Sequence, residues 1–197
     1  MRVKLTTFTP ASQRDRLWQS RSYDYHSGAS LVKRRLGTSL PSVPIMNMTW
    51  QSHLLTTPTE IATLLERSKR VAILGIKPDP EKAANFVPAF LQAAGYEIIP
   101  VPVYYPELTE LLGEPVYRSL MDIPGDIDIV DVFRRPTAIP AHIDDILAKK
   151  PKAVWFQLGI RNDEAAETLA RAGIDVVQDR CMLVEVKRLE GRTSSRG

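Results

Sequence analysis

Short apolar runs alternate with longer amphipathic stretches along most of the chain. The runs are rich in Val and Ile and are typical of strands buried on both faces of a parallel sheet. They predict strands at residues 71–74, 96–103, 128–133, 153–159 and 175–181. Helical spacing of apolar residues predicts a leading helix after Thr57 and further helices at residues 84–95, 139–150 and 162–173.

Alternation of strands and helices with short connections predicts an α/β fold. We expect a Rossmann-like, five-stranded parallel sheet with right-handed crossovers and helices on both faces, as a single domain over residues 48–189. Residues 111–125 are expected to form a short helical crossover. Periodicity does not decide between helix and strand for residues 182–189, and residues 190–197 are expected to be a flexible tail.

Residues 1–47 show neither helical nor alternating periodicity and end in a segment rich in Gly, Ser and Pro, so we expect disorder there. This Arg- and Ser-rich extension resembles an organelle transit peptide, but it could equally be upstream sequence read from a misplaced start codon. Met46 and Met48 lie just before the first structured segment and favour the misplaced start.

Composition narrows the classes of function. The single cysteine, Cys181, excludes an internal disulfide and multi-cysteine metal sites, and it favours the reducing cytoplasm. Residues 48–197 carry 18 basic and 21 acidic side chains, which argues against nucleic acid as a partner. No apolar run reaches transmembrane length, so no membrane partner is expected, and the sequence does not identify a protein partner.

Ligands of such sheets bind at the carboxyl ends of the strands, and candidate residues follow each predicted strand. Gly75 ends the first strand, where it could let the backbone approach a phosphate or could simply make a tight turn. Pro78 stiffens the loop that follows. Lys77, Arg134 and Arg135 could bind phosphate, although ordinary solvated strand ends also carry such residues.

Two common nucleotide motifs are missing from the sequence. The first strand is not followed by G-x-G-x-x-G, and no acidic residue ends the second strand, as an NAD site would require. No glycine precedes Lys-Ser or Lys-Thr, so a P-loop is absent as well. Tyr104 and Tyr105, after the second strand, could flank a base or could serve only in packing.

Several blocks, in order, carry a family resemblance. They are Val-Ala-Ile-Leu-Gly at 71–75, Leu-Gly-Glu-Pro-Val-Tyr at 112–117, Asp-Val-Phe-Arg-Arg-Pro at 131–136, Trp-Phe-Gln-Leu-Gly at 155–159 and Asp-Arg-Cys at 179–181. Over about residues 55–189 the chain resembles the small stand-alone CoA-binding proteins. That family is itself similar to the CoA-binding N-terminal domain of the succinyl-CoA synthetase alpha subunit.

The resemblance implies a CoA or acyl-CoA site at the carboxyl edge of the sheet. By this resemblance the phosphates are bound by Gly75, Ile76 and Lys77. The resemblance also implies that the adenosine side is lined by Val101, Pro102, Phe133, Arg134 and Arg135. It implies that the pantetheine arm passes along Gln157 and Gly159. From its position alone, Cys181 is expected to face the pantetheine end, and the alternative is an inert buried thiol. Many relatives have Val-Asn-Pro after the second strand, where this chain has Val-Pro-Val at 101–103, which removes one amide contact.

We expect a binding protein rather than an enzyme. Acyl-CoA ligases of the resembled type need a phosphorylatable histidine in a second domain and an ATP-binding partner, and neither is recognisable in this sequence. The alternatives are an NAD(P)-linked oxidoreductase, one half of an acyl-CoA-forming complex, or a structural partner that has kept the fold and lost the ligand.

Overall fold

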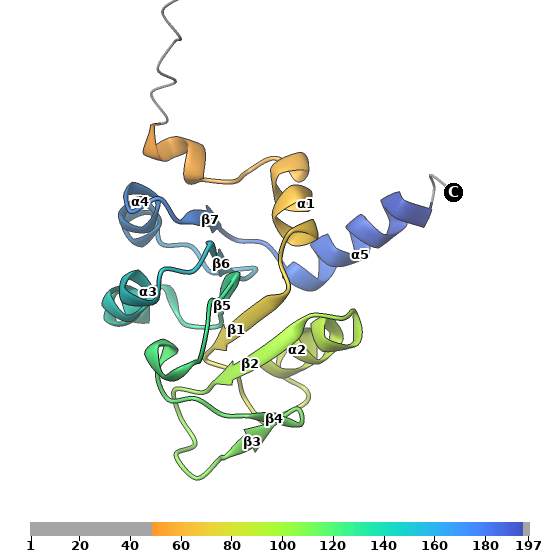
Figure 1. The fold of residues 1–197 in the computed structure, drawn as a ribbon, viewed down its shortest axis with the longest axis vertical. Coiled ribbons are helices and arrows are strands. Elements are labelled where there is room, and N and C mark those ends of the chain that lie inside the picture. The colour runs from red at the N-terminus through yellow and green to blue at the C-terminus, as the bar shows by residue number, and fades with distance from the viewer. Residues whose placement is uncertain (1–48, 195–197) are drawn as a thin grey trace, which may run out of the picture. The chain divides into compact units, whose positions relative to one another are not determined.

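The computed structural model describes residues 49–194, so the expected disorder of residues 1–47 lies outside the described residues. Its main sheet has the order β2-β1-β5-β6-β7 (Figure 1). The strands are β1 (Arg70–Leu74), β2 (Glu97–Val101), β5 (Ile129–Val132), β6 (Ala153–Phe156) and β7 (Asp175–Val177), and every pairing between them is parallel. The predicted α/β, Rossmann-like fold is confirmed.

Helices cover both faces of this sheet (Figure 1). One face carries α1 (Pro58–Glu66), α2 (Ala83–Ala93) and α5 (Met182–Ser194), and the other carries α3 (Ile143–Lys149) and α4 (Asp163–Arg171). On the first face Leu64, Leu91 and Met182, one from each helix, share a core cluster with Trp155 of β6. This shared packing holds all three helices on the same face of the sheet.

Predicted helix ends agree with the observed caps at two places. Thr57 and Glu60 form a reciprocal capping box at the start of α1, and the side chain of Asn162 accepts a hydrogen bond from the Ala165 amide at the start of α4. The helix expected at residues 139–150 begins instead with the 3-10 turn η4 (Pro140–His142) and continues as α3, and a separate 3-10 turn, η3 (Pro136–Ala138), precedes it. Prolines at the start of each turn remove the amides that a continuous helix would need.

Residues 111–125 do not form the expected helical crossover. They contain most of a small antiparallel hairpin of β3 (Glu110–Leu111) and β4 (Glu114–Pro115), and then the 3-10 turn η2 (Leu120–Asp122). Leu112 and Gly113 connect the two strands with φ of 57° and 75°. Two consecutive positive φ values are the geometry of a tight hairpin turn, which a helical interpretation of Leu-Leu-Gly overlooks.

The undecided segment after Cys181 is helical. It forms α5, which continues to Ser194, so the expected flexible tail is corrected for residues 190–194. Met182 and Val186 lie one helical turn apart and are both buried in the core cluster that also holds residues of α1 and α2. This packing holds the first turns of α5 against the sheet, and the helix extends beyond them past Gly191.

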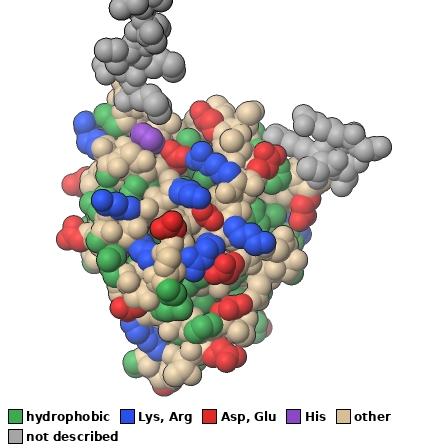
Figure 2. Space-filling view, viewed as in Figure 1, with side chains coloured by type: hydrophobic (Ala, Val, Ile, Leu, Met, Phe, Trp, Pro, Cys, Tyr) green, Lys and Arg blue, Asp and Glu red, His purple; other side chains and the backbone are tan. Residues whose placement is uncertain are grey.

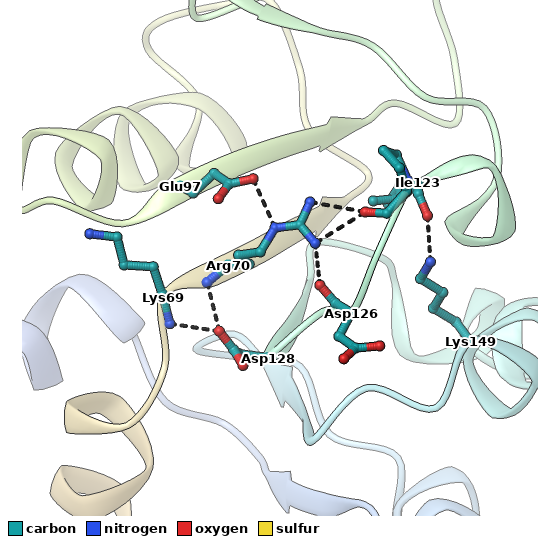
Figure 3. A network of polar contacts seen from close by, with 8 residues as sticks. Lys69, Arg70, Glu97, Ile123, Asp126, Asp128 and Lys149 are labelled. Atoms are coloured by element: carbon teal, nitrogen blue, oxygen red, sulfur yellow. Dashed lines mark hydrogen bonds and ion pairs between the residues drawn. The ribbon is translucent and has the colours of Figure 1, made fainter.

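A polar network closes the amino ends of the strands, opposite the edge where ligands are expected (Figure 3). A carboxylate oxygen of Asp128 accepts hydrogen bonds from the amides of Lys69 and Arg70, both at 2.8 Å. Burial alone would raise the pKa of Asp128, but these bonds and the ammonium of Lys152 outweigh it and lower the pKa. The guanidinium of Arg70 donates to Glu97 at 2.8 Å. It also donates to the backbone carbonyl oxygens of Pro124 and Asp126, in the loop that precedes β5. These groups serve the fold.

Both edges of the sheet carry a further segment. At the β7 edge the amide of Leu55 donates to the carbonyl of Val176 at 2.8 Å. At the β2 edge the amide of Tyr117 donates to the carbonyl of Pro100 at 2.9 Å, and Pro100 itself has no amide hydrogen.

Candidate functional site: a cationic and apolar cavity at the carboxyl edge

Loops after β1, β5, β6 and β7 meet the start of α2 around a cavity of about 550 Å3, which we call the α2 cavity. Its lining is Lys77, Lys82, Ala83, Ala84, Phe86, Val87, Phe133, Arg134, Arg135, Pro136, Gln157, Leu158, Gly159, Ile160 and Cys181. Seven of the residues singled out from the sequence therefore come together here: Lys77, Phe133, Arg134, Arg135, Gln157, Gly159 and Cys181.

Gly75 supports the edge of this site through backbone packing. Its φ is 94°, and a Cβ atom there would lie 2.9 Å from the carbonyl oxygen of Phe133 and 3.0 Å from Cδ of Arg134. Its amide donates to the carbonyl of Val101 at 2.8 Å. The glycine therefore lets the β1 turn pass close to the loop that carries Arg134, and a larger residue would disturb that loop directly.

The loop between β1 and α2 is closed by its own hydrogen bonds. The amide of Lys77 donates to the carbonyl of Ala84 at 3.1 Å, and the buried side chain of Asn85 donates to the carbonyl of Lys77 at 2.7 Å. No side chain caps α2 at Lys82. The amides of Gly75 and Lys77 are thus already bonded, and those of Asn85 and Phe86 donate to the Lys82 carbonyl. The Lys77 ammonium and the amides of Ala83 and Ala84 at the start of α2 can therefore serve an anion.

Arg134 is, with Lys77, one of the two half-buried cations of the site. Its guanidinium carbon lies 5.2 Å from the ring centre of Tyr104, and this hydrogen-bonding cation lowers the pKa of the Tyr104 phenol. Across residues 49–194, Arg134 Nε is the buried side-chain nitrogen that lacks a hydrogen-bond partner. In the same part of the chain neither Lys77, Arg134 nor Arg135 forms an ion pair with a carboxylate.

Gln157 faces inward, toward a carboxyl group that sequence reasoning missed. Its side-chain nitrogen Nε2 donates to both carboxyl oxygens of Asp131 in β5, each at 2.9 Å. Its side-chain oxygen Oε1 accepts a hydrogen bond from the backbone amide of Met182 at 3.3 Å. Asp131 is fully buried, and this burial raises its pKa to about 8, which favours the neutral form at pH 7. An acidic residue inside an otherwise apolar strand was the available signal.

Val101 and Pro102 line a different, smaller cavity of about 240 Å3 together with Tyr104, Arg118 and His142, which we call the Tyr104 cavity. Burial, and then the charge of Arg134, lower the pKa of His142. Through its contact with the Tyr104 ring, Arg134 connects the two cavities. Three other predicted site residues line neither cavity: Gly75 packs against the loop after β5, Ile76 is buried in the core, and Pro78 lies in the loop beyond it.

A third cavity, also of about 550 Å3, lies beside β7, and we call it the β7 cavity. Each of its charged groups is bonded to another side chain or to the backbone. Arg161 pairs with Asp163 at 2.8 Å, and Arg180 reaches Glu185 at 3.4 Å and the carbonyl of Thr56 at 3.2 Å. The carboxylate of Asp179 accepts from the amide of Gly159 at 2.7 Å.

Comparison of the sequence with models of known protein families identifies the family of this chain. The model of the CoA binding domain matches residues 69–187, which includes the whole α2 cavity. The chain belongs to this family. This membership confirms the resemblance seen in the sequence blocks.

Individual relatives agree over the same part of the chain. The uncharacterized protein YneT of Bacillus subtilis (strain 168) is 40% identical over 125 residues, covering 64% of this chain and 90% of YneT. A solved structure from Thermus thermophilus, cell-free ID.343, is 42% identical with a TM-score of 0.64, covering 68% of this chain and 99% of that one. The solved structure of a hypothetical protein from Pyrococcus horikoshii OT3 is 37% identical with a TM-score of 0.63, covering 68% of this chain and 92% of that one.

Other kinds of site receive little support from the residues that the structure describes. Within residues 49–194, no group of His, Cys, Asp and Glu side chains is arranged to hold a metal ion, and no helix is long and apolar enough to cross a membrane. On the face shown in Figure 2, basic and acidic side chains are intermixed and do not form one basic patch.

Proposed function

We propose that this CoA-binding-domain protein binds coenzyme A or its thioesters in the α2 cavity, without catalysing a reaction on them. The observation that carries this proposal is Arg134: a half-buried guanidinium at the cavity wall whose buried Nε has no partner within the described residues. A phosphate oxygen would satisfy that donor, because forked guanidinium groups bind phosphate through charge-assisted hydrogen bonds.

The rest of the cavity suits the remainder of a CoA molecule. Lys77, Lys82 and Arg135 add positive charge on the same side as Arg134, next to the uncapped first turn of α2, where helix amides attract anions. Tyr104, against the Arg134 guanidinium, offers a ring at the neighbouring Tyr104 cavity, where we place the adenine side. The pantetheine arm would then pass Gln157 and Gly159 toward Cys181.

A role in binding without catalysis is supported by the positions of the described histidines. His53 bonds Asp175 at 2.8 Å, at the amino end of β7, and His142 lines the Tyr104 cavity. Neither lines the α2 cavity. The single cysteine and the mixed surface charge favour the cytoplasm as the place of action, and a small-molecule nucleotide rather than a nucleic acid as the partner.

Titration calorimetry of the full chain with CoA, dephospho-CoA and NAD tests this proposal. CoA should bind most tightly, and Arg134→Ala should weaken it roughly ten- to a hundredfold, because a charge-assisted hydrogen bond contributes about 1.5–3 kcal/mol. Arg161→Ala is the matched control, since it removes an arginine from the β7 cavity. Equal and weak binding of the three nucleotides, with no response to Arg134→Ala, would rule out the CoA assignment.

A further inference from the structure

The α2 cavity is chemically divided along the sheet. Its cations follow β1 and β5 or begin α2, whereas Leu158 and Ile160 follow β6. Because the strand order is β1-β5-β6 and adjacent parallel strands lie about 5 Å apart, these loops are displaced by roughly 10 Å from β1 to β6. Phe86, one turn into α2, extends the apolar lining.

The apolar half includes side chains that solvent reaches. Leu158 is 70% exposed and Phe86 is 47% exposed, and both line the cavity. Large exposed apolar groups that converge on one cavity mark a binding surface more often than isolated ones do.

The loop that presents Leu158 is held firmly. On one side the Gln157 side chain is bonded inward to Asp131, and on the other the Gly159 amide donates to Asp179 at 2.7 Å. The amide of Ile160 donates to the carbonyl of Gln157 at 2.8 Å, which closes the turn. Leu158 therefore cannot relieve its exposure by a local collapse of the loop, and a ligand that covers it gains apolar burial without ordering the loop.

From this division we infer that the α2 cavity is built for an acyl thioester of CoA, whose aliphatic chain lies against Leu158 and Phe86 while its phosphates meet the cations over β1 and β5. The inference rests on the proposed function. Charge complementarity fixes the anionic end of the occupant, and the apolar wall formed by Leu158 after β6 and Phe86 of α2 accepts a hydrocarbon chain. Free CoA ends in a small thiol and would leave that wall largely uncovered.

Calorimetry of the full chain with CoA, acetyl-CoA and octanoyl-CoA separates this inference from the proposed function. Octanoyl-CoA should bind at least about tenfold more tightly than CoA, a difference equal to about 1.4 kcal/mol, which burial of two methylene groups would supply. Acetyl-CoA should lie between them. Leu158→Ser and Phe86→Ser should bring the ratio of the octanoyl-CoA and CoA affinities close to one.

Met121→Ser is the matched control, because Met121 is 53% exposed and lines neither the α2 cavity nor the Tyr104 cavity. It should keep the wild-type ratio. No binding of CoA at all would defeat the proposed function, whereas equal affinities for CoA and octanoyl-CoA would defeat the acyl inference and leave the proposed function standing. Light scattering could instead show that the wild-type protein is a dimer and that Leu158→Ser makes it monomeric. That result would assign the apolar wall to a second copy of the chain, and it would also overturn the inference.

Discussion

The α2 cavity and the β7 cavity have the same volume, about 550 Å3, but satisfy their charges differently. In the β7 cavity, Arg161 and Arg180 each bond a carboxylate, as expected of groups that stabilise the fold. In the α2 cavity, Arg134 contacts the ring and hydroxyl of Tyr104 but pairs with no carboxylate, and its buried Nε has no partner in the described chain. The two cavities thus differ not in size but in how completely their charged groups are bonded within the chain, and incomplete bonding is the feature we expect of a ligand site.

The largest expected difference concerns the carboxyl group below the α2 cavity. Asp131 has a folded-state pKa of about 8 against a reference value of 3.8, so the folded protein keeps a proton that the unfolded chain releases from about pH 4 upward. The free energy of unfolding should therefore fall as pH rises toward 8, by about 1.4 kcal/mol per pH unit, or on the order of 3 kcal/mol between pH 5 and pH 7. Asp131→Asn should flatten this slope in urea titrations.

Asp128→Asn serves as the control for that measurement. The folded-state pKa of Asp128 is lowered, so its contribution to stability is present above its unfolded pKa and is lost only in more acidic solution. The variant should be less stable throughout the range from pH 5 to pH 7 while keeping the wild-type slope. An unchanged slope in Asp131→Asn would show that Asp131 is ionised in the folded protein.

The second prediction concerns the packing of Gly75. Gly75→Ala should reduce the free energy of unfolding by roughly 2–3 kcal/mol, because it combines a positive φ with a methyl group 2.9 Å from the Phe133 carbonyl. Gly173→Ala is the control, since Gly173 has a φ of 81° with no atom within 4 Å of its Cβ position, and it should lose only about 1 kcal/mol. Equal losses in urea unfolding would mean that the loop after β5 moves aside easily.

The smallest differences separate the arginines of the two cavities. Arg180→Ala should destabilise the protein by about 1–2 kcal/mol, because it leaves Glu185, which is 7% exposed, with one fewer cation and removes a bond to the Thr56 carbonyl. Arg134→Ala should change stability by less than about 0.5 kcal/mol, since no ion pair is lost within the described residues. A large loss of stability in Arg134→Ala would make it a structural residue and weaken the contrast between the cavities.

Much of the fold could be predicted because the periodicity of apolar residues and the residues that cap helices or form turns depend on local sequence. Runs of Val and Ile gave the strands, and Thr57, Asn162 and Gly173 marked helix ends. The turn at Leu112 and Gly113 was missed because a leucine with positive φ leaves no sequence signal. Apolar spacing predicts one helix over residues 139–150 with Pro140 near its start, whereas Pro140 begins a 3-10 turn that precedes α3.

The candidate site was predictable in its residues more than in their roles. Parallel strands bring their carboxyl ends to one edge, so Lys77, Arg134 and Cys181 were expected to converge, and the structure places all three around the α2 cavity. The inward orientation of Gln157 could not be predicted, because it depends on Asp131, 26 positions away in the sequence. The contact between Gly75 and the Phe133 carbonyl is likewise a product of strand adjacency.

The covered sheet edges have a consequence for behaviour at high concentration. Chains with a bare edge strand can add copies of themselves one after another through backbone pairing, which leads to extended ladders and fibres. Here the amide of Leu55 occupies a β7 carbonyl, and at the β2 edge Tyr117 bonds Pro100, which has no amide hydrogen to offer. A neighbouring copy would have to displace a segment of the chain before it could pair. Open-ended growth through strand addition is therefore disfavoured, and copies that meet must do so through side-chain surfaces.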